Sequence, residues 1–371
     1  MASFEYAKLD GGFDFKSSSS AFGGLCAGTG QEWRAAFTDF WRLYREYDAN
    51  HPVFQEQHDM SVRLPVFCHG DEGRGLRRVP FMVEVWQPVL SHKGANCTNM
   101  SGHTFCSRLL FTCISSKLFA GDLTLRQINR AWAEQMISLS QDGVPAGIWN
   151  LFLTFLGGKG DWPYLRKALD IYTGSGYCCR QIPAENWHDF SEDAPWRHER
   201  PNPSPFKEDG NPFHKVPGAD DALRVLPDVM HTYHIGFGVD FCASIIMWLA
   251  NLGHFGHKGK IDDWLREAHS RFMQWCAANG KYSACTEWSR RTFHMKSKLV
   301  PNSGAACKAH DTGVVTAWLE HVLRGIAPDN GIIDTMRYTV SQCNVFFRTL
   351  HKHGNFIPPA DKDKAMSDMQ T

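Results

Sequence analysis

The chain has 371 residues, with 39 Lys and Arg against 39 Asp and Glu, so its formal net charge at pH 7 is zero. This balance excludes a polybasic, histone-like protein, and any contact with nucleic acid must come from a local basic patch. Because 43% of the residues are hydrophobic and 21% are charged, the chain can bury a substantial core and global disorder is excluded.

The compartment can be read from three further features. The first residues, MASFEYAKLDGG, lack the basic and apolar layout of a secretory signal peptide. The longest apolar stretch, Phe241 to Leu252, is shorter than the roughly 20 residues of a membrane helix. Twelve cysteines are too sparse for a disulfide scaffold. We therefore expect a nuclear or cytoplasmic protein, not secreted and without a membrane partner.

The first part of the chain combines a tail and a helix. Residues 1–30 are rich in glycine and serine, which predicts a flexible N-terminal tail. Residues 31–60 carry an aromatic stripe at helical spacing, which predicts a helix from about 31 to 47. The stripe consists of Trp33, Phe37, Phe40, Trp41 and Tyr44.

Residues 61–180 show the pattern of an α/β core. Three runs rich in β-branched and aromatic residues predict strands at 63–68, 80–89 and 105–114. A helix with a 3.6-residue period follows Asp122 and ends at Gly143, and a fourth strand is predicted at 149–156. The order β-β-β-α-β, with a parallel fourth strand after the crossover helix, is that of an RNase H-like mixed sheet.

The second half of the chain is different in character. Residues 181–221 contain seven prolines among charged residues and predict a long Pro-rich loop. Residues 222–371 predict a largely helical region, an insertion domain with a C-terminal part. Its helices are expected at 239–252, 261–277, 312–324 and 332–351.

Two glycine-rich segments place an aspartate at the end of a predicted strand. Asp71 lies in His69-Gly70-Asp71-Glu72-Gly73-Arg74-Gly75 after the first strand, where the plain alternative is an acidic hairpin turn. Asp161 follows the fourth strand, where it can also cap the next helix, with Pro163 in the first turn. Carboxylates at neighbouring strand ends can share hard cations, and two metals support phosphodiester transfer. We expect a two-metal site with Mg²⁺ or Mn²⁺.

A third segment, LPDVMHTYHIGFGVD, contains Asp228, His231 and His234. Two histidines three residues apart lie on one helical face and could bind Zn²⁺ with a carboxylate. A buried, hydrogen-bonded histidine is the plainer interpretation, and in phosphoryl transfer a histidine can instead hold the scissile phosphate. We favour the last role for His231, with Asp228 and His234 in support.

One segment is locally cationic and is the candidate DNA contact. It interleaves basic residues with Tyr282, Trp288 and Phe293, and aromatic faces can stack unpaired bases while basic groups contact phosphates. A solvated helix face is the more common meaning of such a run. With the arginine that follows the first acidic segment, the candidate DNA-binding residues are Arg74, Lys281, Arg290, Arg291, Lys296 and Lys298.

Four segments together resemble the transposases of CACTA (En/Spm) DNA elements, in an order that spans about residues 64–347. They are HGDEGRGLRRVPFMVEVWQP, LSQDGVPAGIWNLFLTFLGGKGDWPYLRKAL, LPDVMHTYHIGFGVDFCAS and KAHDTGVVTAWLEHVLRGIAP. The resemblance implies an RNase H-like domain split by a helical insertion, with two Asp and one Glu around two Mg²⁺ ions. It also implies transposon-end DNA as partner and possible self-association.

By that resemblance Asp71 and Asp161 are catalytic metal ligands, and His231 acts with Asp228 near the scissile phosphate. The family's Cys-x-x-Cys after the second aspartate is not reproduced by Cys178-Cys179. The third acid is also not identified, since Glu320 is predicted to face solvent and Glu287 matches no motif. We expect this glutamate to lie beyond the chain's end, and the chain alone to be feebly active.

Three functions therefore remain open. The first is a metal-dependent transposase or part of one. The second is a catalytically silent, transposon-derived protein that binds DNA or another protein. The third is a Zn-dependent hydrolase that uses His231 and His234.

Overall fold

The computed structural model divides into two units, Met1–Pro227 with His353–Phe356, and Asp228–Lys352 with Ile357–Thr371. The structure describes residues 30–55, 57–74, 79–90, 108–146, 148–171, 193–194, 206–207, 210–293, 295, 309–328, 331–353, 356–358 and 360–361. The predicted tail, most of the predicted Pro-rich loop and Cys178-Cys179 lie outside these residues. The protein is mixed α/β, as the sequence predicts.

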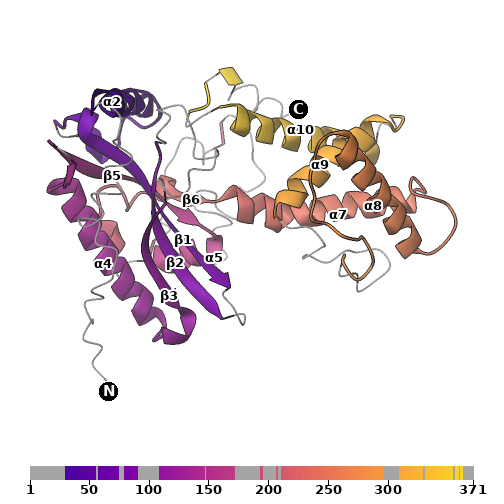
Figure 1. The fold of residues 1–371 in the computed structure, drawn as a ribbon, viewed down its shortest axis with the longest axis horizontal. Coiled ribbons are helices and arrows are strands. Elements are labelled where there is room, and N and C mark those ends of the chain that lie inside the picture. Colours follow the sequence, from indigo (N-terminus) through magenta and orange to yellow (C-terminus); the bar gives the residue numbers. More distant parts are fainter. Residues whose placement is uncertain are drawn as a thin grey trace. The chain divides into compact units, whose positions relative to one another are not determined.

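The first unit is built on a mixed sheet (Figure 1). Its strand order is β3-β2-β1-β5-β4, and β6 also pairs with β5. Strands β1, β2 and β3 are antiparallel neighbours, whereas β1–β5 and β5–β6 are parallel. The strands are β1 (Arg63–Arg74), β2 (Pro80–Pro88), β3 (Leu109–Ser115), β4 (Val144–Ala146), β5 (Trp149–Gly160) and β6 (Val225–Pro227).

The predicted strands 63–68, 80–89 and 149–156, and the described part of 105–114, all lie in this sheet. The short strands β4 and β6 have no counterpart in the sequence prediction. The hairpin turn considered for this acidic segment is wrong for His69 to Arg74, because β1 continues through these residues and pairs Arg74 with Pro80 of β2. Asp71 is therefore a strand residue.

Helix α4 (Asp122–Gln141) is the crossover between β3 and the β4–β5 hairpin, and it packs along the sheet (Figure 1). Trp132 of α4 is buried, stacks on Phe111 of β3 at 5.1 Å and meets Trp86 of β2 edge-on at 5.3 Å. Gly143 follows the helix with φ of 71°, a conformation that glycine adopts without strain. This aromatic packing fixes the crossover on the sheet.

The described part of the first unit also contains two further α-helices. Helix α2 (Gly30–Tyr47) buries Phe37, Phe40 and Trp41, and the Trp41 indole donates to the carbonyl of Arg63 at 2.8 Å. Its aromatic stripe is thus core packing. Helix α5 (Trp162–Ala168) follows β5 directly, and Asn129 of α4 donates to the Ala168 carbonyl at 2.7 Å.

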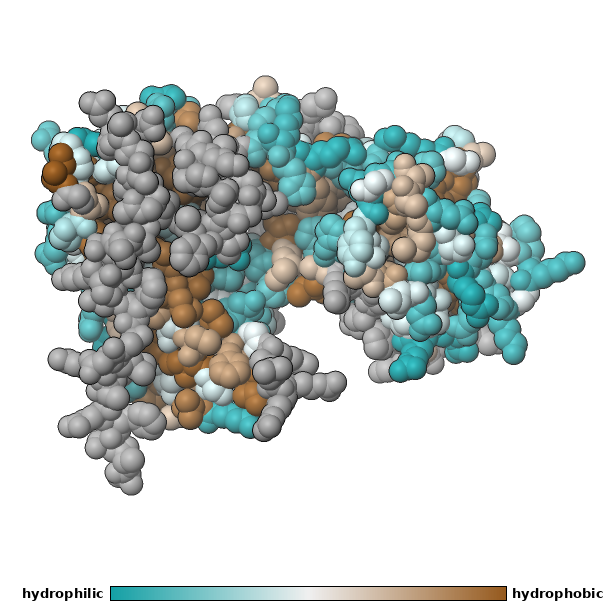
Figure 2. Space-filling model, in the orientation of Figure 1, coloured by the Kyte–Doolittle hydropathy of each residue, from teal (hydrophilic) through white to brown (hydrophobic). Residues whose placement is uncertain are grey.

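The second unit is helical, at nearly the positions that the periodicity predicts. It contains α7 (Gly238–Asn251), α8 (Ile261–Ala278), α9 (Ala309–Arg324) and α10 (Ile332–Lys352). Phe272, Trp288 and Trp318 pack together in its core, with ring centroids 5.1 to 5.6 Å apart. The visible face of this unit is mostly hydrophilic (Figure 2).

Helix α7 is preceded by a π-helical segment, Met230–Phe237, with a non-helical residue at Gly236. Together they form a stretch of 22 residues, Met230–Asn251, that is long and apolar enough to cross a membrane, with mean hydropathy 1.4. However, 56% of that window is buried inside the protein. A buried core helix meets the same two criteria, so length and composition are weak grounds for a span.

Candidate functional site

Three aspartates directly follow the last residue pairs of the parallel ladders between β1, β5 and β6. Gly70 of β1 pairs with Gly160 of β5, and Gly160 pairs with Pro227 of β6. Asp71, Asp161 and Asp228 are the next residues in the chain. Since parallel strands end at the same edge of a sheet, the register alone brings these positions side by side.

The carboxylates of Asp71 and Asp161 lie close together. Each offers an oxygen, and these atoms lie within 4.8 Å of one another. Both residues are half-buried. Within the first unit, both carboxylates belong to a group of candidate metal ligands found among the described residues. Oxygen ligands at this separation suit a hard divalent cation.

Asp161 also caps α5. One of its carboxylate oxygens accepts a hydrogen bond from the backbone N–H of Tyr164 at 2.7 Å, and Pro163 lies in the first turn. This bond satisfies a helix N-terminal donor and fixes the carboxylate. The capping role and a ligand role are compatible, because the second carboxylate oxygen is not used by the cap.

Asp228 and His231 form a pair within one turn. One Asp228 oxygen accepts from the His231 backbone N–H at 2.8 Å, and the other lies 2.7 Å from the ring Nδ1. When Nδ1 donates to this carboxylate, Nε2 carries the lone pair that can bind a cation or accept a proton. His231 is only four residues past Pro227, a span of at most roughly 14 Å. Covalent continuity thus keeps it near the end of β6.

His234 does not share this role. Its ring stacks on Phe347 of α10 at 4.9 Å, and its carbonyl accepts from Thr312 of α9 at 2.6 Å. Burial, and then His351 and His310, lower the pKa of His234. His234 is not a member of the metal-ligand group found among the described residues.

The cationic segment is partly core. Trp288 and Phe293 are each 2% exposed in the second unit, so the prediction that they stack on bases is wrong. Tyr282 is exposed. The basic side chains that the structure describes there are solvent-exposed, namely Lys281, Arg290 and Arg291. Lys296, Lys298 and the Arg74 side chain lie outside the described residues.

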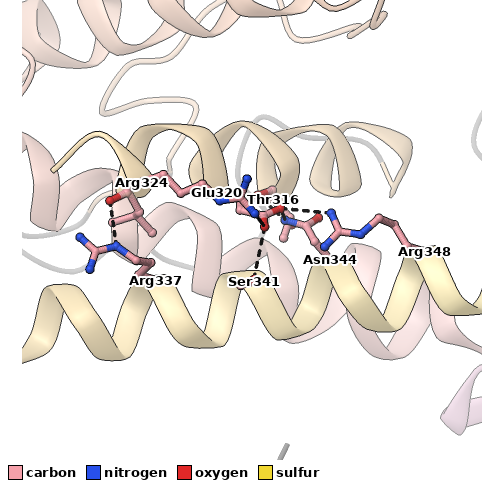
Figure 3. A network of polar contacts seen from close by, with 8 residues as sticks. Thr316, Glu320, Arg324, Arg337, Ser341, Asn344 and Arg348 are labelled. Carbon is pink, nitrogen blue, oxygen red and sulfur yellow. Dashed lines mark hydrogen bonds and ion pairs between the residues drawn. The ribbon is translucent and has the colours of Figure 1, made fainter. Parts of the chain in front are cut away.

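Glu320 is not the solvent residue that its helix pattern predicts. It is 6% exposed on α9, and α10 covers it (Figure 3). Its carboxylate accepts hydrogen bonds from four side chains: Arg324 at 2.5 Å, Asn344 at 3.0 Å, Ser341 at 3.3 Å and Arg348 at 3.3 Å. A carboxylate held in this way serves the packing of α9 on α10. Glu287, the other candidate acid, is exposed.

Sequence reasoning missed Glu84, which is completely buried on β2. Burial raises the pKa of this carboxyl to about 8, and its Oε1 accepts from the Tyr164 hydroxyl at 3.1 Å. The sequence pattern could have identified Glu84, because it lies at an inward-facing position of β2, between the buried Met82 and Trp86. A carboxyl in an apolar alternation is an unusual residue that calls for a partner.

No family model and no curated protein matches this chain.

Proposed function

We propose that the first unit carries the active site of an RNase H-like enzyme that cleaves phosphodiesters with a divalent cation. The strand order β3-β2-β1-β5, the crossover helix α4 and the parallel β6 support this class. The observation that carries the proposal is the pair of carboxylates, Asp71 and Asp161, within 4.8 Å where the parallel pairing of β1 with β5 ends. Carboxylate oxygens are ligands that Mg²⁺ and Mn²⁺ prefer.

Within that class we propose a transposon-derived protein similar to the CACTA (En/Spm) transposases, with transposon-end DNA as its partner in the nucleus. The four resembling segments occur in the family's order, and a helical unit follows β6 as the family's insertion would. Lys281, Arg290 and Arg291 are exposed basic residues for phosphate contacts. We also propose that the protein associates with copies of itself, as the resemblance implies.

Each residue of the proposed site has its own role in this reaction. Asp71 and Asp161 would hold the cation, which supplies Lewis-acid stabilisation of charge on the phosphodiester. Asp228 fixes the His231 ring through Nδ1 and so aims Nε2. With Nδ1 bonded to Asp228, a protonated His231 would donate from Nε2 to an oxygen of the scissile phosphate, and a neutral His231 would accept the proton of the attacking water there. The Tyr164 N–H keeps the Asp161 carboxylate oriented.

The described ligands suffice for one cation. A second cation would need another oxygen donor. The Glu320 carboxylate is already bonded to four side chains, and Glu287 matches no motif. The proposed activity is therefore weak for this chain alone. The alternative is a silent protein that retains the fold and binds DNA or protein.

Calorimetric titration with Mn²⁺ and a supercoiled-plasmid nicking assay test the proposal. We expect Mn²⁺ binding and slow Mg²⁺- or Mn²⁺-dependent nicking, both abolished in Asp161→Asn and Asp71→Asn. Asp39→Asn changes an exposed carboxylate on α2 and is the matched control. Nicking that persists in Asp161→Asn would place the activity elsewhere.

Other outcomes identify the alternatives. Plasmid binding without Mn²⁺ uptake or nicking would indicate the silent protein. Tight Zn²⁺ that copurifies and depends on His231 and His234 would indicate the hydrolase. Both results contradict the proposed function.

A further inference from the structure

Each of the two site aspartates is preceded by a glycine, and the position of the Tyr164 ring explains why. A Cβ placed on Gly70 would lie 2.0 Å from Cζ of Tyr164. A Cβ on Gly160 would lie 2.6 Å from the carbonyl oxygen of Gly70 and 2.6 Å from Cδ1 of Tyr164. The Tyr164 ring thus occupies the space next to both strands, and only glycine leaves room for it.

Tyr164 is held at both of its ends. Its backbone N–H donates to Asp161 at 2.7 Å, and its hydroxyl donates to Glu84 at 3.1 Å. Glu84 lies on β2 directly opposite Gly70, the residue before Asp71. One side chain therefore connects the cap of α5, the backbone beside Asp71 and strand β2.

The pair formed by Tyr164 and Glu84 is buried. Tyr164 is 6% exposed and Glu84 is 0% exposed. The second oxygen of Glu84, Oε2, finds no hydrogen-bond partner among the described residues. Burial raises the pKa of Glu84 to about 8, and burial and Glu84 raise the pKa values of Cys68 and Tyr164, the neighbouring titratable groups. Glu84 is thus a neutral acid at pH 7, so it adds no charge beneath the aspartates.

We propose that Tyr164, anchored by Glu84, is a positioning residue that sets the separation and orientation of the Asp71 and Asp161 carboxylates. The inference rests on the proposed function, because its consequence is the affinity of that pair for a divalent cation. Removing the hydroxyl frees the ring to shift against Gly70 and Gly160. The carboxylates then lose their fixed separation while the fold remains.

Mn²⁺ affinity, measured by calorimetry and by the Mn²⁺ electron paramagnetic resonance spectrum, tests this role. In Tyr164→Phe we expect about 10-fold weaker binding, in the range found when outer partners of metal ligands are lost. Glu84→Gln keeps an acceptor for the hydroxyl and should retain the wild-type affinity, whereas Glu84→Met should match Tyr164→Phe. Circular dichroism and thermal melts verify that each variant is folded.

Tyr44→Phe is the matched control, because it also removes a buried phenol hydroxyl from the first unit. We expect its Mn²⁺ affinity and spectrum to be unchanged. If the wild type binds Mn²⁺ in an Asp161-dependent way and Tyr164→Phe binds equally well, the positioning role is refuted and the proposed function stands. If the wild type binds no Mn²⁺, both are refuted.

Discussion

The buried carboxyl of Glu84 makes a quantitative prediction about pH. Its pKa of about 8 in the folded protein lies above the ordinary value of 4.5, so the folded state binds more protons than the unfolded state between these values. The free energy of unfolding then falls as pH rises from about 4.5 to 8 and is level beyond. At 1.36 kcal/mol for each pKa unit, the fall between pH 5 and 9 is about 4 kcal/mol.

Glu84→Gln removes this titration and keeps the shape of the side chain. We expect the difference in unfolding free energy between the variant and the wild type to change by about 4 kcal/mol, in the variant's favour, from pH 5 to 9. Urea unfolding at several pH values, followed by Trp fluorescence, gives this difference. The comparison with the variant is needed because His51 also titrates. Below pH 6.5 its contribution to the free energy of unfolding changes with pH in the opposite direction.

The control is Glu287→Gln, an exposed glutamate of the second unit. It should follow the wild type at every pH. A wild type and a Glu84→Gln variant with parallel pH profiles would show that Glu84 ionises normally, and the argument from burial would fail.

Three further predictions concern single side chains. Asp161→Ala loses the cap of α5 and should destabilise the first unit by about 1 kcal/mol, whereas Asp161→Asn keeps an acceptor and should melt like the wild type. Glu320→Gln should destabilise the second unit by about 1–2 kcal/mol in urea, because Arg324 and Arg348 are exposed enough to regain water, and should leave nicking unchanged. Burial lowers the pKa of His51 to about 4, so stability present above pH 6.5 should fall by about 3 kcal/mol toward pH 4, and less in His51→Gln.

The sequence predicts the central sheet because its strands carry strong local patterns. β2 alternates buried Met82, Glu84 and Trp86 with partly exposed neighbours, and this period of two identifies a strand with one covered face. The helices of the second unit are equally periodic. β4 and β6 have three residues each, too few for any period, and tertiary pairing with β5 creates them.

The prediction that Glu320 faces solvent is wrong for a different reason. The stripe Val315, Trp318 and Leu319 identifies one packed face of α9, and the opposite face is therefore predicted to be exposed to solvent. In the structure Thr312, Thr316 and Glu320 are also buried. The segment Met230–Phe237 contacts the two threonine hydroxyls, and α10 contacts Glu320. Asn344 of α10 donates to both the Thr316 carbonyl and Glu320. A helix packed on two sides buries a polar stripe that one-sided periodicity cannot reveal.

The placement of His231 depends on how β6 ends. Pro227 is the last residue paired with β5, and because proline has no N–H it cannot extend the ladder. The chain therefore leaves the sheet at Asp228, two residues before the π-helical segment, and one oxygen of its side chain accepts a hydrogen bond from the backbone N–H of His231. The other oxygen contacts the ring, so the residue that follows β6 also orients the histidine. A strand of three residues thereby places an Asp-His pair directly after the end of β6, and local pattern in the sequence could not predict so short a strand.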